Sequence, residues 1–235
     1  MVKQMVNCLH GLRHDALILH RDISSGNIMY KGVLDGKDRF VLTDFDLAVF
    51  TDKNGQSTGP TSHHRTGTLP FMAFDLISNM ADSSELPLSS SEREHLQHCV
   101  RHDFESLFWV SLWCAVSVVS PGKEDPVQKQ KGLKYLSRWE EHPLENVANQ
   151  KQAIITGGSI QLKKAPLSPS FKHLYGWLKA FCSCIQKGLQ ANINWVDANE
   201  DIAPPFKDYE TGHGMVTRDE LFKAFTDYEK ALPKP

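Results

Sequence analysis

Residues 20–27 read His-Arg-Asp-Ile-Ser-Ser-Gly-Asn, and residues 42–46 read Leu-Thr-Asp-Phe-Asp. Each stretch follows a short apolar run, which predicts loops at the ends of strands. Asp22 precedes Asn27 by five residues, and Asp44 follows Asn27 by seventeen. Phosphoryl transfer needs such groups, because one carboxylate can orient a hydroxyl nucleophile while an amide oxygen and a second carboxylate hold divalent ions. Asp22 is therefore the candidate catalytic base, and Asn27 and Asp44 are the candidate Mg²⁺ ligands.

These motifs resemble those of eukaryotic-type protein kinases, and most closely those of the fungal-type protein kinase family. That family favours H-R-D-I-S-x-G-N and D-F-D, which this chain matches almost letter for letter. Residues 65–75 resemble the end of an activation segment, and residues 101–107 the start of a buried central helix. The resemblance implies a mainly α fold with a small β component, the large C-terminal lobe of a kinase. It assigns the catalytic loop to 20–27, the activation segment to 44–75 and the central helix to about 103–119.

The resemblance also assigns roles to further residues. Asp103 is expected to tie down the backbone of the catalytic loop, with His20 packed beneath that loop as a structural residue. Thr68 is expected to bond toward Asp22 and to help shape the substrate site. Arg21 is a candidate regulatory residue that pairs with a phosphate on the activation segment. A pairing of this arginine with a fixed acidic group is an equally good interpretation.

Candidate positions for that phosphate are Ser57, Thr58, Thr61, Ser62 and Thr66, with Arg65 as a second cationic partner.

Three positions depart from the common kinase pattern. Ser24 stands where most Ser/Thr kinases carry a lysine, so it brings no charge to the transferred phosphoryl group. Asp46 replaces the glycine of D-F-G and removes a residue that tolerates positive φ. Asp75 replaces a glutamate that usually anchors the segment to a distal arginine, and the sequence does not identify that arginine.

The small N-terminal lobe of a kinase is missing from the sequence pattern. No Gly-rich loop or paired lysine precedes His20, and Gly157-Gly158 lacks the spaced glycines of a phosphate cradle. Residues 1–13 instead predict an amphipathic helix. Its apolar face consists of Val2, Met5, Val6, Leu9 and Leu12. The sequence thus predicts one domain, residues 1–235, equivalent to an isolated large lobe that binds Mg–ATP poorly or not at all by itself.

Composition limits the partners and the compartment. The net charge of -2 gives no reason to expect nucleic acid or an anionic membrane as a partner. The apolar segment 104–119 is shorter than a membrane span and favours a buried core helix. Five irregularly spaced cysteines and no signal segment indicate an intracellular protein. Cys182-Ser183-Cys184 lacks a second pair at zinc-ligand spacing.

The remaining segments predict alternating helices and polar connections. Further helices are expected over 133–139, 171–187 and 217–231, the last opened by a capping box of Thr217 and Glu220. Polar connections are expected over 51–65 (a mobile loop), 81–94, 121–132, 157–170 and 197–214.

Three function classes fit this sequence. The first is a Ser/Thr protein kinase that uses ATP and Mg²⁺ on a protein substrate. The second is a small-molecule kinase of the choline or aminoglycoside type, which Asp46 suits but the peptide-docking segment from Gly67 to Asp75 opposes. The third is a non-catalytic, pseudokinase-like interaction module or truncated kinase fragment, with a small lobe or a partner chain completing the nucleotide site.

Overall fold

The computed structural model describes residues 1–58, 67–85, 97–118, 125–140, 143–199 and 204–231. Within these residues the fold is mainly helical with a small β component, as the sequence predicts. The α-helices are α1 Val2–His14, α2 Phe74–Glu85, α3 Val100–Ser117, α4 Pro126–Ser137, α5 Leu144–Leu162, α6 Tyr175–Ala198, α7 Phe206–Thr211 and α8 Arg218–Ala231. The 3₁₀ turns are η1 Leu69–Phe71 and η2 Pro169–Leu174, and the strands are β1 Ile18–Leu19, β2 Ile28–Leu34, β3 Lys37–Leu42 and β4 Val49–Phe50.

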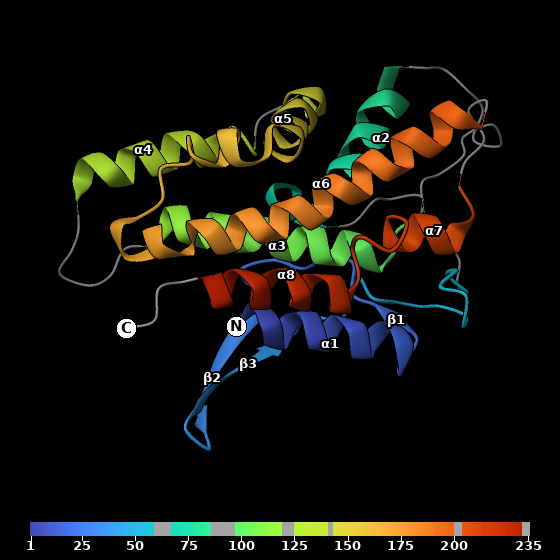
Figure 1. The fold of residues 1–235 in the computed structure, drawn as a ribbon, viewed down its shortest axis with the longest axis horizontal. Coiled ribbons are helices and arrows are strands. Elements are labelled where there is room, and N and C mark those ends of the chain that lie inside the picture. The colour runs from blue at the N-terminus through green and yellow to red at the C-terminus, as the bar shows by residue number, and fades with distance from the viewer. Residues whose placement is uncertain (59–66, 86–96, 119–124, 141–142, 200–203, 232–235) are drawn as a thin grey trace.

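Helix α3 is the centre of the core. It lies between α4, α5 and α6 on one side and α1 and α8 on the other (Figure 1). Its side chains are buried on nearly every face, and Trp109 packs edge-to-face on Trp139 while Phe108 packs on Phe181. A helix apolar all round can be stable only inside such a core. None of the helices in the described part of the chain combines the length and apolarity needed to cross a bilayer.

The predicted boundaries of this helix are wrong by a few residues. It spans Val100–Ser117 rather than about 103–119, because the Cys99 N–H donates to His102 Nδ1 at 3.0 Å and caps the helix before Asp103. The proposed stop at Pro121-Gly122 lies outside the described residues.

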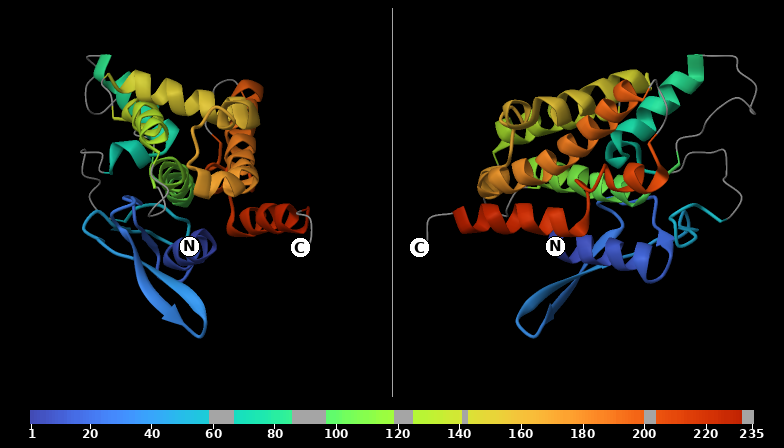
Figure 2. Two further views of the ribbon diagram at one scale, coloured as in Figure 1. Left: turned by 90° about the vertical axis from the view of Figure 1, so that its left-hand side faces the viewer. Right: turned by 45° about the vertical axis from the view of Figure 1, so that its right-hand side comes forward.

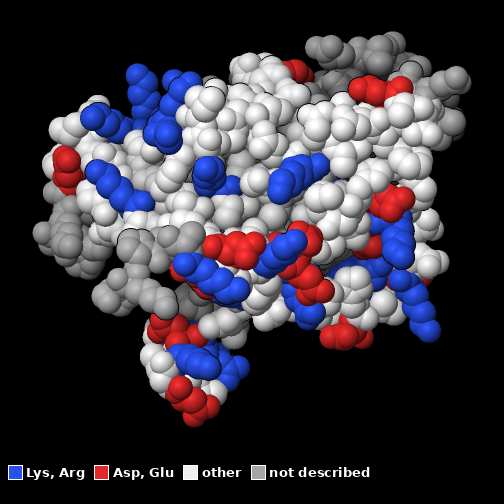
Figure 3. All heavy atoms as spheres, in the orientation of Figure 1, with Lys and Arg blue, Asp and Glu red and all other residues white. Residues whose placement is uncertain are grey.

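The predicted N-terminal amphipathic helix is confirmed as α1. Met5, Val6 and Leu9 are buried, while Val2 and Leu12 are partly buried against the same core. Helix α1 runs beside α8, where Lys3 and Glu229 form an exposed ion pair. Figure 3 shows acidic and basic side chains intermixed over this face and over the β2–β3 hairpin.

Two small antiparallel strand pairs lead into the loops that contain the H-R-D and D-F-D motifs. Strands β2 and β3 pair from Ile28–Leu42 to Leu34–Lys37, around a turn at Asp35 and Gly36 with φ of 51° and 71°. Positive φ at both central residues is the two-residue turn that suits a hairpin. The hairpin extends away from the helices (Figure 2). Strands β1 and β4 pair through Ile18–Phe50 and Leu19–Val49, so the stretches before His20 and after Asp46 lie together.

Several predicted connections are helical. Asp125 accepts hydrogen bonds from the N–H groups of Val127 and Gln128, and this cap with Pro126 starts α4 inside the predicted loop 121–132. Helix α5 runs through the predicted loop 157–170 as far as Leu162, bending at Gly158 with φ of 48°. The predicted helix 171–187 begins as η2 and continues as α6 to Ala198.

The other predicted connections are partly outside the described residues. Thr51–Thr58 forms a hydrogen-bonded turn rather than the expected mobile loop, with the Thr58 N–H donating to the Phe50 carbonyl at 3.0 Å. Residues 59–66 of that stretch and 86–96 of the serine-rich stretch lie outside the described part of the chain. Helix α2 occupies the start of the serine-rich stretch, and α7 occupies part of 197–214. Thr217 caps α8 by accepting the Glu220 N–H at 3.3 Å, as the capping box predicts.

Candidate active site

Asp103 of α3 joins the central helix to the loop at residues 20–27. Its Oδ2 accepts the His20 N–H at 3.1 Å, and its Oδ1 accepts the Arg21 N–H at 3.2 Å. His98 Nε2 lies 2.8 Å from the same Oδ1. Burial raises the pKa of Asp103, but His98 and the donated N–H groups outweigh it, so the pKa lies below the ordinary value. The carboxylate therefore stays charged inside the core and fixes the start of the loop.

His20 lies fully buried beneath this loop. Its Nδ1 accepts the Asp22 N–H at 3.3 Å, and its Nε2 lies 3.0 Å from the Thr43 carbonyl oxygen. A ring nitrogen that accepts from an N–H carries no proton, so the Nε2–H tautomer donates to Thr43. His20 consequently connects the two loops that carry Asp22 and Asp44, and it has no free nitrogen for acid-base work.

Both carboxylate oxygens of Asp22 are held. Oδ1 accepts the Thr68 N–H and the Thr68 hydroxyl, each at 2.9 Å. Oδ2 accepts from Asn27 Nδ2 at 3.1 Å, and the same Nδ2 donates to the Asp22 carbonyl at 2.9 Å. Because the amide nitrogen of Asn27 faces Asp22, its carbonyl Oδ1 is the atom left to bind another ligand.

Asp44 and Asn27 lie at the same end of the β2–β3 hairpin. The N–H and hydroxyl of Thr43 donate to the Asn27 carbonyl at 2.9 and 3.2 Å, directly before Asp44 in the chain. Asp44 itself is exposed and has a φ of 63°, while Arg21 has a φ of 71°. Left-handed backbone at two non-glycine residues is a strain that proteins tend to keep at functional loops.

The donor set suits Mg²⁺ better than a softer metal. An amide oxygen and a carboxylate are hard ligands, and Mg²⁺ usually takes one or two such groups with waters and substrate phosphates. Among the described residues no group of three or more His, Cys, Asp or Glu side chains could hold a metal by itself. Asn27 and Asp44 would therefore share the ion with a phosphate-bearing ligand.

Arg21 extends from the loop beside this set. Burial lowers the pKa of its guanidinium and Asp103 raises it, and the buried Nε has no hydrogen-bond partner among the described residues. Ser57 and Thr58, two of its candidate phosphate positions, lie in the turn that follows β4. The other candidates, Thr61, Ser62 and Thr66, lie outside the described residues with Arg65.

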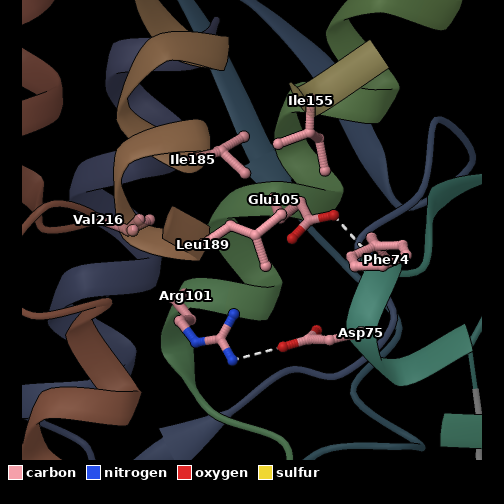
Figure 4. A pocket seen from close by; sticks show the side chains of 9 residues that line it. Phe74, Asp75, Arg101, Glu105, Ile155, Ile185, Leu189 and Val216 are labelled. Atoms are coloured by element: carbon pink, nitrogen blue, oxygen red, sulfur yellow. Dashed lines mark hydrogen bonds and ion pairs between the residues drawn. The ribbon is translucent and has the colours of Figure 1, made fainter. Parts of the chain in front are cut away.

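The sequence analysis missed the arginine that binds Asp75. Arg101 Nη2 lies 2.5 Å from Asp75 Oδ2, and Arg101 Nε donates to the Tyr209 carbonyl at 2.7 Å. Burial raises the pKa of Asp75, but Arg101 and His102 outweigh it and hold the pKa well below its usual range. Figure 4 shows Arg101 of α3 pointing to Asp75 at the start of α2. A charged residue next to a buried helical run was the available signal, since buried arginines need acidic partners.

Lys151 of α5 was also missed. It is fully buried, and its Nζ donates to the carbonyls of Pro70 and Met72, immediately after Thr68. A lone lysine in a stretch for which no element was predicted gave no sequence signal for this contact.

Comparison with known families agrees with this arrangement. A family model described as fungal protein kinase matches residues 1–115. Residues 1–115 are thus similar to the fungal protein kinase family. The predicted resemblance is thus confirmed for the stretch that contains Asp22, Asn27, Asp44, Thr68 and Asp103. Neither a search of curated proteins nor a search of solved structures found a match. Helices α4 to α8 follow the part that matches the fungal kinase family.

Proposed function

We propose that this protein transfers the γ-phosphate of ATP to Ser or Thr hydroxyls of protein substrates, and that residues 1–235 form a kinase large lobe. The observation that carries the proposal is the double restraint on Asp22, by Thr68 from the activation segment and by Asn27 from the catalytic loop. A small-molecule kinase would not need a segment such as Gly67–Asp75 fixed against its base.

The residues divide the chemistry as follows. Asp22 orients the substrate hydroxyl and accepts its proton, a role that contributes roughly 10²- to 10⁴-fold to the rate. Asn27 Oδ1 and the Asp44 carboxylate would hold Mg²⁺, which when bound would neutralise the phosphate charge. Thr68 keeps the carboxylate of Asp22 in one orientation and borders the substrate. Asp103 and His20 fix the loop that carries these groups.

Strand β2 offers the apolar surface that an adenine base needs. Ile28 packs against the core, and Met29 next to it on the opposite face is 53% exposed. Met29 lies two residues beyond Asn27, so a nucleotide whose phosphates share a metal with Asn27 has an apolar side chain within reach.

One observation favours a second candidate, the non-catalytic interaction module. Ser24 is 5% exposed and therefore brings neither charge nor an accessible hydroxyl to a transferred phosphoryl group. A kinase with this residue is expected to be slow, and an interaction module would lose nothing by it.

The decisive experiment measures transfer of radiolabelled phosphate from Mg–ATP to a Ser/Thr peptide library, with choline and aminoglycosides as alternative acceptors. Asp22→Asn keeps the shape of the base and removes its charge, so transfer should fall at least about 100-fold. Asp35→Asn is the matched control, because Asp35 is exposed at the hairpin turn and asparagine suits its positive φ. Equal turnover in Asp22→Asn, or transfer to the small molecules instead, would contradict the proposal. No transfer to any acceptor would favour the interaction module.

A further inference from the structure

We propose that Lys151 is a positioning residue for the substrate side of the site, holding the turn after Thr68 so that Thr68 stays against Asp22. This inference rests on the proposed function, in which Thr68 and Asp22 face the protein substrate. Helix α5 lies outside the residues that match the fungal kinase family, so neither that match nor the motifs of the catalytic loop assign this role.

The ammonium group of Lys151 binds two backbone carbonyls of one short turn. Nζ donates to the Pro70 oxygen at 2.9 Å and to the Met72 oxygen at 2.5 Å. It also lies 4.7 Å from the ring centre of Trp109 and 5.8 Å from that of Trp139, over their faces. Two carbonyls and two aromatic faces replace much of the hydration that a buried cation loses.

Glu105 of α3 binds the backbone of Phe74, two residues after Met72. Its Oε1 accepts the Phe74 N–H at 2.7 Å and the Trp109 indole N–H at 3.0 Å. Figure 4 shows Glu105 reaching from α3 to Phe74 at the start of α2. Lys151 and Glu105 together fix the backbone at Pro70, Met72 and Phe74 from two different helices.

Lys151 and Glu105 each shift the pKa of the other. Burial lowers the pKa of Lys151, and Glu105 raises it. Burial and the nearby Asp75 raise the pKa of Glu105, while Lys151 lowers it. Glu105 also lines a small cavity together with Arg101, Phe74 and Ile155.

The turn transmits this restraint to Thr68. The Phe71 N–H donates to the Thr68 carbonyl at 2.8 Å, and the Met72 N–H donates to the Leu69 carbonyl at 3.3 Å. Thr68 is therefore the first residue of a closed turn whose far end Lys151 holds. Because a displacement of about 1 Å at a reacting group can cost about 10²-fold in rate, fixing the far end of the turn matters for Asp22.

A methionine at this position would separate positioning from packing. It is close to lysine in length and apolar, and replacing a buried charge by an apolar residue of similar volume is often neutral for stability. The carbonyls of Pro70 and Met72 would then lose their donor while the aromatic contacts remain. If Lys151 serves packing alone, Lys151→Met should leave Thr68 as it is in the wild type.

The test is amide hydrogen exchange of Lys151→Met, with Lys163→Met as the control because Lys163 is exposed at the end of the same helix. We expect the Thr68 and Phe71 amides to exchange at least about 10-fold faster in Lys151→Met, with the amides of α1 and α3 unchanged. The control should match the wild type. Wild-type exchange at Thr68 in folded Lys151→Met would overturn the proposal.

A second variant and a second readout keep the outcome decisive. If Lys151→Met does not fold, Lys151→Gln is measured instead; a smaller increase in exchange at Thr68 is then expected, because its amide can still donate to one carbonyl, and wild-type exchange would overturn the proposal. In the transfer assay the KM for peptide should rise at least about 10-fold in Lys151→Met, while the KM for ATP stays unchanged. If the wild type transfers no phosphate, the proposed function fails, and the exchange of Thr68 still decides the role of Lys151.

Discussion

Thr68 donates both its backbone N–H and its hydroxyl to one carboxylate oxygen of Asp22, each at 2.9 Å. These two residues are 46 positions apart in the chain, and the contact joins the loop after β1 to the turn before α2. Asp22 is thereby held in a single orientation by the turn that precedes α2.

Removing the Thr68 hydroxyl should weaken transfer. Thr68→Val keeps the shape and the N–H but loses one hydrogen bond to a charged group, which typically contributes about 1.5 to 3 kcal/mol. Transfer should fall roughly 10- to 100-fold. Thr68→Ser keeps the hydroxyl and serves as the control in the same peptide assay. Equal rates for Thr68→Val and Thr68→Ser would show that the hydroxyl does not position Asp22.

Asp103 should dominate the stability of the catalytic loop. Asp103→Asn removes the charge and places an NH2 group opposite one of the two backbone donors, the His20 or the Arg21 N–H, so that buried donor is left unpaired. We expect the free energy of unfolding in urea to fall by about 2 to 4 kcal/mol. The exposed Asp35→Asn serves as the control. A loss below about 1 kcal/mol would mean that the loop is fixed by other contacts.

His102 should make the fold sensitive to mild acid. Its Nδ1 accepts the Cys99 N–H, so the ring must stay neutral, and burial lowers its pKa to about 4 although Asp75 raises it. The unfolded chain takes up this proton near the ordinary value of 6.5 and the folded chain only near 4. The stability contribution is therefore complete above about pH 6.5 and is lost as the pH falls from 6.5 to 4.

The measurement is the pH dependence of urea unfolding for the wild type and His102→Asn, in which the amide oxygen can replace Nδ1 as acceptor. The difference between the two curves should slope between pH 6.5 and 4 and be flat above. Parallel curves would contradict the assignment. Below about pH 3.8 both proteins should lose stability, because the unfolded chain protonates Asp75 near its ordinary value while the folded chain, in which the pKa of Asp75 is depressed, still holds the charge.

Gly55 should be irreplaceable for docking of the turn after β4. It has a φ of 90°, and a Cβ there would collide with Arg13 and Glu210, a buried ion pair between α1 and α7. Gly36 also has positive φ, at 71°, but has open space around it. In urea unfolding, Gly55→Ala should therefore lower the free energy of unfolding by about 1 to 3 kcal/mol more than Gly36→Ala. Both variants strain the backbone at positive φ, but only Gly55→Ala also overpacks its surroundings. Equal losses would show that Arg13 and Glu210 move aside.

The resemblance of the motifs predicted the contacts of Asp22, Thr68 and Asp103 better than periodicity predicted the helices. Asp22, Asn27 and Thr68 come together because short loops at the ends of strands leave little freedom to their side chains. The first part of helix α4 was missed because the Pro, Gly and charge content of 121–132 predicted a surface loop, although Asp125-Pro126 caps and starts a helix. The end of helix α5 was missed because the Pro, Gly and charge content of 157–170 predicted a surface loop, whereas the helix continues past a bend at Gly158.

Contacts between distant segments were beyond sequence reasoning. Arg101 and Asp75 are 26 positions apart, and Lys151 and Pro70 are 81 apart. A buried charge chooses its partner by three-dimensional proximity, which one sequence without its fold does not specify. The sequence indicated that the Asp75 carboxylate anchors its segment, but it did not indicate that the partner is Arg101 on α3.

The most direct test of the account asks whether Asn27 and Asp44 bind a metal together with nucleotide phosphates. Paramagnetic Mn²⁺ used in place of Mg²⁺ broadens the NMR signals of nearby nuclei, so even weak binding can be detected. The wild type is measured with ATP added, and the exposed Asp35→Asn serves as the control. We expect the amide signals of Asn27, Asp44 and their neighbours to broaden when Mn²⁺ and ATP are both present. Asp44→Asn should abolish this broadening. Broadening that is unchanged in Asp44→Asn, or centred on another part of the chain, would contradict the account.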